Sequence, residues 1–225
     1  MAKALRILWL RPVRSEGGYG VGGVDSKALT TESRALTFQL GHTITLPYGK
    51  GQHWGSNASG IAQAALGGWQ FSGATTLESG ETESLTLSSN ATLNSDFSQL
   101  PNIIPGCKPS NVPGGQNASH WFNQACFTTP AMYQFGDYAP GSLNGPPIAN
   151  ADFALSKEFG FSSFLNREKT TVQVRMEAYN VFNLTNLGMW QWGHGCANCS
   201  GSNVITSLQM GYPMRRLQFG VHMSW

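Results

Sequence analysis

Regular alternation of apolar and polar residues is the dominant pattern along this chain, and helical periodicity is nearly absent. In residues 36–46, leucine, phenylalanine, histidine and isoleucine occupy one face, while threonine, glutamine and glycine occupy the other. A period of two residues places successive side chains on opposite faces of a β-strand. The alternation predicts five strands, at residues 36–46, 69–78, 149–161, 171–182 and 216–225.

The predicted strands are long, at roughly 10–13 residues each, whereas strands of soluble proteins most often have about 5–6. A tilted strand needs about 9–11 residues to cross a bilayer. The polar faces carry Gln, Arg, Glu and His, as a water-filled lumen allows, and Lys157 is the one exception on the apolar face of its strand. We therefore expect an all-β fold, with antiparallel up-and-down strands of a partial transmembrane β-barrel, about five long strands and long irregular loops.

The connections between these strands differ strongly in length. Outer-membrane barrels have short periplasmic turns and longer extracellular loops, and a compact soluble domain rarely contains a structureless connection of more than about 15 residues. A short helical turn is expected at residues 61–66 in the first connection. The four connections, two of them long, are residues 47–68, 81–148, 162–169 and 183–215.

Composition supports a β-rich chain with polar loops. Charged residues make up 12% of the sequence, against about 25% in ordinary globular proteins, and the net charge is only +2. This balance argues against a disordered tail, a nucleic-acid-binding protein and a polybasic membrane patch, and the many Gly and Pro residues argue against a helical bundle.

The beginning of the chain gives no clear targeting signal. Residues 3–13 resemble a signal peptide, but Arg6 and Arg11 interrupt the apolar stretch and no small-residue cleavage site follows, so we do not interpret them as one. No apolar run approaches 18 residues, so no transmembrane helix is expected. We expect residues 1–34 to be irregular and residues 35–225 to form the C-terminal part of an outer-membrane β-barrel.

The C-terminal segment is the most informative. Its pattern Gln218-x-Gly220-x-x-Met223-x-Trp225 resembles the insertion signal that the barrel-assembly machinery reads, although that signal prefers an aromatic residue where Met223 stands. The alternative is an ordinary final strand of a soluble sheet. Four preceding strands of the same period favour the assembly signal.

The four cysteines lie in the two long loops. A bond between Cys107 and Cys126 would enclose 18 residues and contribute about 3 kcal/mol by chain entropy, which suits an oxidising compartment. Cys196 and Cys199 follow His194, but no fourth zinc ligand is evident. We expect a local disulfide or a reduced pair there, and no metal.

No catalytic constellation stands out. The five histidines have no Ser/Asp or Cys/Asp arrangement around them, and we expect neither enzymatic activity nor a cofactor. Arg175 and Glu177 share one strand face and are interpreted as a lumenal charge pair rather than a catalytic or ligand-binding pair. Trp121, Trp190 and Trp192 are loop aromatics that either stack on a sugar or other organic ring of a ligand, or pack the loops and form an interfacial girdle; both readings stay open.

Several stretches together resemble one family. In chain order they are LPYGKG at 46–51 with GGWQ at 67–70, DFSQLPNIIPGC at 96–107, WFN at 121–123 with CF at 126–127, GP at 145–146 before DF at 152–153, and RMEAYNVFN at 175–183. They are similar, in order and spacing, to TonB-dependent outer-membrane receptors of the Oar-like group, which often carry a carboxypeptidase-regulatory-like domain at the N-terminus. The resemblance covers about residues 35–225.

The resemblance implies a part of a nutrient importer in the outer membrane of a Gram-negative-type bacterium. The strands would supply barrel wall, and loops 81–148 and 183–214 would cover or touch an unknown small-molecule or oligosaccharide ligand. Expected partners are outer-membrane lipid, the barrel-assembly machinery and, only through a missing N-terminal part, TonB; no nucleic acid is expected. Such receptors are plugged barrels of about 22 strands, so this chain resembles the last part of one.

A second class stays under consideration, a secreted β-sandwich such as a carbohydrate-binding module with its loop tryptophans as a platform. Strand length and the uncovered apolar stripes disfavour it. A secreted hydrolase, the third class, lacks a defensible acid/base pair.

Overall fold

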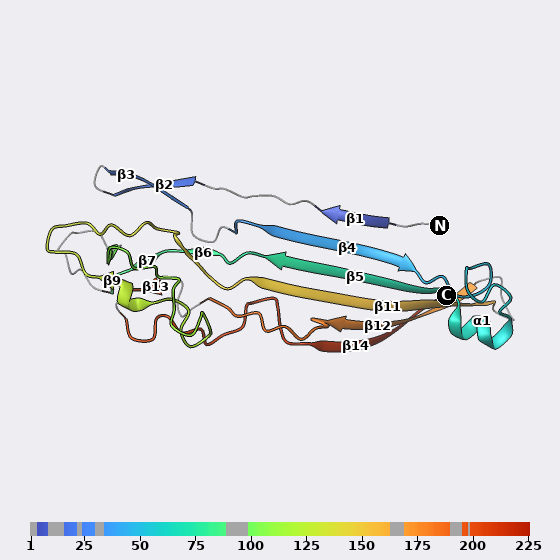
Figure 1. The fold of residues 1–225 in the computed structure, drawn as a ribbon. Coiled ribbons are helices and arrows are strands. Elements are labelled where there is room, and N and C mark those ends of the chain that lie inside the picture. Colours follow the sequence, from blue (N-terminus) through green and yellow to red (C-terminus); the bar gives the residue numbers. More distant parts are fainter. Residues whose placement is uncertain are drawn as a thin grey trace.

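The computed structural model describes residues 4–8, 16–21, 24–29, 34–88, 99–162, 169–189, 195–197 and 199–225. Its main feature is a long six-stranded sheet, with a body of folded loops at one end and a short helix at the other (Figure 1). The strands, in spatial order, are β1 (Ala4–Leu8), β4 (Thr37–Thr45), β5 (Trp69–Glu78), β11 (Ile148–Ser162), β12 (Lys169–Tyr179) and β14 (Arg216–Ser224).

All neighbours in this sheet are antiparallel, and the long strands follow one another in chain order. This is the up-and-down arrangement that the alternation predicts, and the sheet is open, as a partial barrel is. The strands are long because the alternation continues through single glycines such as Gly41 and Gly73. The described residues contain no helix with the length and hydrophobicity of a transmembrane span.

The described residues among the first 34, a stretch that we expected to be irregular, include three strands. Strand β1 pairs with β4, and β2 (Glu16–Val21) pairs with β3 (Val24–Leu29) in a separate hairpin. An edge strand is held by backbone hydrogen bonds that any residue except proline supplies. The charged residues that spoil a signal peptide in this stretch therefore do not prevent a strand.

The fourth predicted strand ends earlier than its pattern suggested, at Tyr179. Asn180 and Asn183 adopt left-handed backbone angles, with φ of 49° and 54°, which asparagine tolerates better than other residues with a Cβ. The Asn180 amide donates to the carbonyls of Leu184 (2.8 Å) and Pro213 (3.1 Å), and its oxygen accepts from the Leu184 N–H (2.9 Å). This buried asparagine turns the chain from the strand into the following loop.

Cross-strand register gives the sheet one apolar and one polar face. One row of directly opposed residues crosses the sheet as Ile44, Phe71, Leu155, Met176 and Phe219, and the adjacent row as Thr43, Ser72, Ala154, Glu177 and Gln218. The apolar face is uncovered, and Phe219 is 73% exposed. A row of exposed hydrophobic side chains is unfavourable in water and favourable against hydrocarbon.

The buried core lies outside the sheet, in the loops. Two-residue ladders organise these loops: β6 (Thr82–Glu83) with β10 (Leu143–Asn144), β7 (Leu85–Thr86) with β13 (Gly195–Cys196), and β8 (Asn102–Ile103) with β9 (Phe127–Thr128). A 3-10 helix, η1, covers Gln124–Cys126. At the opposite end of the sheet, α1 (Gly60–Leu66) occupies the place of the expected helical turn.

We predict that a charge is tolerated on one face of β11 and not on the other. Leu155→Arg places a guanidinium on the apolar face and should lower the stability of the inserted protein by about 2–4 kcal/mol at the depth of the bilayer centre. Ala154→Arg, one residue away, places the guanidinium opposite Glu177 on the polar face. The folded fraction in outer-membrane preparations, measured by heat-modifiable migration on gels, should fall only for Leu155→Arg. Equal losses in both variants would contradict the assignment of faces.

Candidate functional site: a polar wall and a loop cap

The polar face of the sheet is hollowed where small side chains lie side by side. A cavity of about 540 Å³ opens there. Its floor exists because β4, β5 and β11 contribute glycine, alanine, serine and threonine in register, so no long side chain fills the space. On the polar face it is lined by Gly41, Thr43, Ser72, Ala74, Asp152, Ala154, Arg175, Glu177 and Tyr179.

One side of this cavity is a hydrogen-bonded row of β12. Arg175 Nε lies 2.6 Å from Glu177 Oε1, and the Tyr179 hydroxyl donates to Glu177 Oε2 at 2.8 Å. The Arg216 guanidinium lies 5.6 Å from the centre of the Tyr179 ring. Both oxygens of Glu177 are therefore engaged, which is the geometry of a wall charge pair, while the half-exposed Arg175 presents positive charge to the cavity.

Asp152 joins this wall to the loop that follows β12. Its Oδ1 accepts a hydrogen bond from the Asn150 amide (2.9 Å) and another from the backbone N–H of Asn180 (2.8 Å). The sequence pattern placed Asp152 on a polar strand face but gave no sign of its bond to Asn180, because the two residues are 28 positions apart.

The two long loops fold together into one body, which we call the loop cap (the described residues within 79–147 and 183–215). Its core is apolar and draws on both loops. The buried members are Leu85, Leu87, Trp121, Phe122, Tyr138, Leu143, Ala197 and Ile205. The Tyr138 hydroxyl donates to the Glu83 carbonyl at 3.4 Å, and burial raises the pKa of this phenol because the phenolate would be desolvated.

Backbone hydrogen bonds lock the two loops to each other. The Trp121 N–H donates to the Asn203 carbonyl at 2.8 Å, and the Ile205 N–H donates to the Ala118 carbonyl at 2.7 Å. The Gln124 amide donates to the Cys199 carbonyl (2.7 Å). The cap is thus a fixed body at one end of the wall, not a set of independent loops (Figure 1).

The structure places Trp121 inside this cap. Its side chain is only 8% exposed, and the indole N–H donates to the Asn144 carbonyl at 2.8 Å. Trp121 therefore packs the loops and offers no free ring face for stacking. Trp190 and Trp192 lie outside the described residues.

Exposed apolar residues of the cap are found elsewhere. Met132, Tyr133 and Phe135 form one exposed stretch, in which Tyr133 has a φ of 62°. The sequence pattern does not predict a role for them, because they lie in no alternating segment; their one signal in the sequence is three large apolar residues within a loop.

Both cysteine pairs are bonded within the cap. Cys107 is joined to Cys126, and Cys196 to Cys199, and the described residues contain no free cysteine. His194 lies outside the described residues. The four sulfur atoms are consumed in covalent bonds, so they are not thiolate ligands in this structure.

The residues of the C-terminal pattern lie on β14 and just beyond it. Gln218 is opposite Glu177, Gly220 is opposite Arg175, and Met223 is opposite Val172. Trp225 follows the strand and is 84% exposed. Among the described residues, β14 pairs only with β12, so its other edge is open.

A one-sided apolar sheet of long antiparallel strands, polar on its other face, defines an outer-membrane β-barrel protein. The chain matches the outer membrane beta barrel domain family over residues 26–218, which is most of its length, and it belongs to that family. Its location is the outer membrane of a Gram-negative bacterium. No curated protein and no solved structure matches it.

We predict that the Cys107–Cys126 bond stabilises the loop cap. Replacing both residues with alanine releases a long loop and should lower the free energy of opening the loop cap by about 3 kcal/mol. The population of the opened cap should therefore rise roughly 100-fold. Thermolysin treatment of intact cells should therefore cleave the cap of this variant much faster than that of the wild type.

The matched control is the double replacement Cys196→Ala, Cys199→Ala. It opens a loop of sequence separation 3 instead of 19, so the entropic loss is smaller. Equal protease sensitivity of the two double variants would contradict this role of the long-range bond.

Proposed function

We propose that this chain supplies barrel wall and extracellular loops of a TonB-dependent outer-membrane receptor that imports a scarce nutrient. The observation that carries the proposal is the loop cap. Two loops pack around a common core and are reinforced by disulfides at one end of the wall. A passive pore needs an open mouth, whereas a receptor needs a rigid surface that recognises its solute before transport.

The open sheet supports a larger wall around this chain. A sheet edge in hydrocarbon leaves backbone N–H and C=O groups without partners, at a cost of several kcal/mol for each group. In our proposal, further strands of the receptor pair with the free edge of β14 and close the wall, as in plugged barrels of about 22 strands. TonB would contact the plug-bearing part and not the residues described here.

The cavity on the polar wall favours a hydrophilic solute. Asp152, Arg175 and Glu177 bring charges of both signs, and Thr43 and Ser72 bring hydroxyls. Such a lining suits a small polar molecule or an oligosaccharide passing along the wall. We propose a binding and transport role without chemistry, since Glu177 is held by Arg175 and Tyr179.

The β-sandwich alternative is not favoured. A sandwich covers the apolar face of each sheet with a second sheet, but here that face has many exposed large side chains, among them Ile44, Met176 and Phe219. The family match points to the membrane instead.

Energised import distinguishes a receptor from a passive barrel. We expect strains lacking this receptor gene, and strains lacking TonB, to deplete the same solute of their growth medium more slowly, as followed by mass spectrometry of the spent medium. Complementation with the intact receptor gene should restore the rate only where TonB is present. If restoration occurs equally without TonB, the protein is a passive barrel and the proposal is wrong.

Assembly through the C-terminal strand gives a second test. Removing Trp225 from the intact receptor should abolish its insertion, because the exposed terminal aromatic is the part of the pattern that the barrel-assembly machinery would hold. Trp225→Phe is the matched control and should insert normally, as judged by membrane fractionation. Normal insertion without Trp225 would show that this residue is not the signal.

A further inference from the structure

Lys157 is a charged residue on the otherwise apolar face of the sheet, and its neighbours explain how the charge is accommodated there. In register it lies between Trp69 of β5 and Val174 of β12, and its side chain belongs to the face of Leu155 and Phe159. Yet it is only 4% exposed. An ammonium group on a lipid-facing surface needs polar partners or a route to water.

The partners of Lys157 come from α1 and from two aromatic rings. Its Nζ donates to the carbonyl of Ala64, near the end of α1. It also lies 5.6 Å from the centre of the Trp69 ring and 5.0 Å from that of Phe159, within reach of a cation–π attraction. The carbonyls at the end of a helix carry partial negative charge, which suits this cation.

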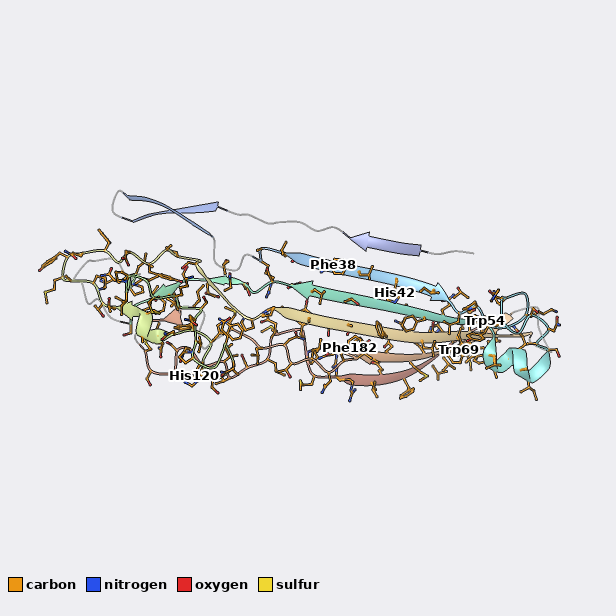
Figure 2. The ribbon with its side chains drawn as sticks, in the orientation of Figure 1. Phe38, His42, Trp54, Trp69, His120 and Phe182 are labelled. Atoms are coloured by element: carbon orange, nitrogen blue, oxygen red, sulfur yellow. A yellow bond between two sulfur atoms is a disulfide. The ribbon has the colours of Figure 1, made fainter. Side chains whose placement is uncertain are left out.

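This contact places α1 on the lipid-facing side of the wall. Because Lys157 points from the apolar face, the helix that accepts its hydrogen bond must lie on the same side. Trp69 holds the helix from the same face, since its indole N–H donates to the Ala65 carbonyl at 2.8 Å. Figure 2 shows Trp69 beside α1, with Trp54 nearby at the same end of the sheet.

A third contact fixes the rotation of α1 about its axis. The Gln63 side chain accepts a hydrogen bond from the Lys50 N–H at 2.6 Å. Gly49, with a φ of 109°, makes room for it, because a Cβ there would lie 2.7 Å from the Gln63 oxygen. Gln63 therefore faces the preceding turn.

The opposite side of α1 is apolar and exposed. At 3.6 residues per turn, Ile61 and Ala65 lie about 160° around the helix from Gln63, whereas Leu66 lies about 60° from it. Ile61 is 88% exposed and Leu66 is 60% exposed, and the helix contains no charged residue. A helix held in this way presents its apolar residues outward, away from the protein.

The part of β11 between Ala149 and Lys157 is long enough to cross most of the hydrocarbon layer. Lys157 lies eight residues beyond Ala149 on β11, about 26 Å at 3.3 Å per residue. With a tilt of about 40°, this is about 20 Å of depth in an apolar band about 25 Å tall. The loop cap lies at the other end, so the helix end is the periplasmic one.

We propose that α1 is an interfacial anchor that rests in the periplasmic leaflet of the outer membrane, with Ile61 among the lipid chains. The occupant of this apolar face is lipid because Lys157 and Trp69, which belong to the lipid-facing side of the sheet, hold α1 there. Exposed Tyr48 and Trp54 of the same connection, whose ring centres lie 5.2 Å apart, fit the aromatic girdle of such an interface. The inference rests on the outer-membrane location and not on the transport proposal.

Site-directed spin labelling tests this anchor. A nitroxide is attached at Ile61→Cys in the intact protein, reconstituted in vesicles of phosphatidylethanolamine and phosphatidylglycerol; the native cysteines are bonded and do not react. Met176→Cys on the apolar face is the lipid reference, and Ser56→Cys in the exposed turn is the aqueous reference. Oxygen concentrates in hydrocarbon and a nickel chelate stays in water, so their ratio of collision rates at position 61 should exceed that at 56 several-fold and approach that at 176.

Three results would overturn the anchor. A ratio at position 61 equal to that at 56 would place the helix in water. Protection from both reagents would show that protein covers it, whether another segment, a partner or a second copy. An aqueous ratio at position 176 would refute the membrane location on which the inference rests, whereas failure of TonB-dependent uptake alone would leave the anchor standing.

The role of Lys157 is tested by a second variant in the protein labelled at position 61. Lys157→Met keeps the length of the side chain but loses the ammonium, so the label should become more mobile and its oxygen-to-nickel ratio should fall. Lys157→Arg keeps a cationic donor and should preserve both values. Unchanged spectra in a folded Lys157→Met variant would show that this residue does not position α1.

Discussion

Complete pairing of backbone N–H and C=O groups between neighbouring strands is the constraint on which the rest of this structure depends. Hydrocarbon offers no hydrogen-bond partners, so a strand can enter it only when both of its edges are satisfied. The antiparallel register that achieves this pairing also aligns side chains across strands, as with Leu155 between Phe71 and Met176. Backbone hydrogen bonding between strands thereby both satisfies the polar groups and divides the sheet into a lipid-facing and a lumenal face.

The loop cap is stabilised differently from the wall. Its residues have no membrane to face and no regular alternation, so they bury apolar side chains such as Phe122 and Leu85 against each other. The first loop supplies most of this core, Ala197 and Ile205 of the second loop complete it, and the pairing of β7 with β13 joins the two loops. The wall supplies the rigid ends that bring these two loops together, and the disulfides then restrict their opening.

Departures from the simple alternation mark the places with the most structural information. Lys157 is a charge on an apolar face, and it holds a helix against the outside of the wall. Asn180 is a buried polar residue with a left-handed backbone, and it ends β12 and turns the chain into the cap. In each case a locally unfavourable residue is satisfied by a partner distant in sequence, which is why the pattern alone could flag it but not explain it.

The sequence by itself determined the wall. Period-two alternation is a local property, so it specified the five long strands and their lipid-facing sides, apart from the early end of β12 at Tyr179, and short-range preferences also indicated α1. Tertiary structure decided what depends on distant contacts: the pairing of β1 with β4, the burial of Trp121 against Asn144, the bond of Cys107 with Cys126, and the helix beneath Lys157. Each of these contacts joins two segments that are far apart in the sequence. A local pattern does not encode which distant segments come together.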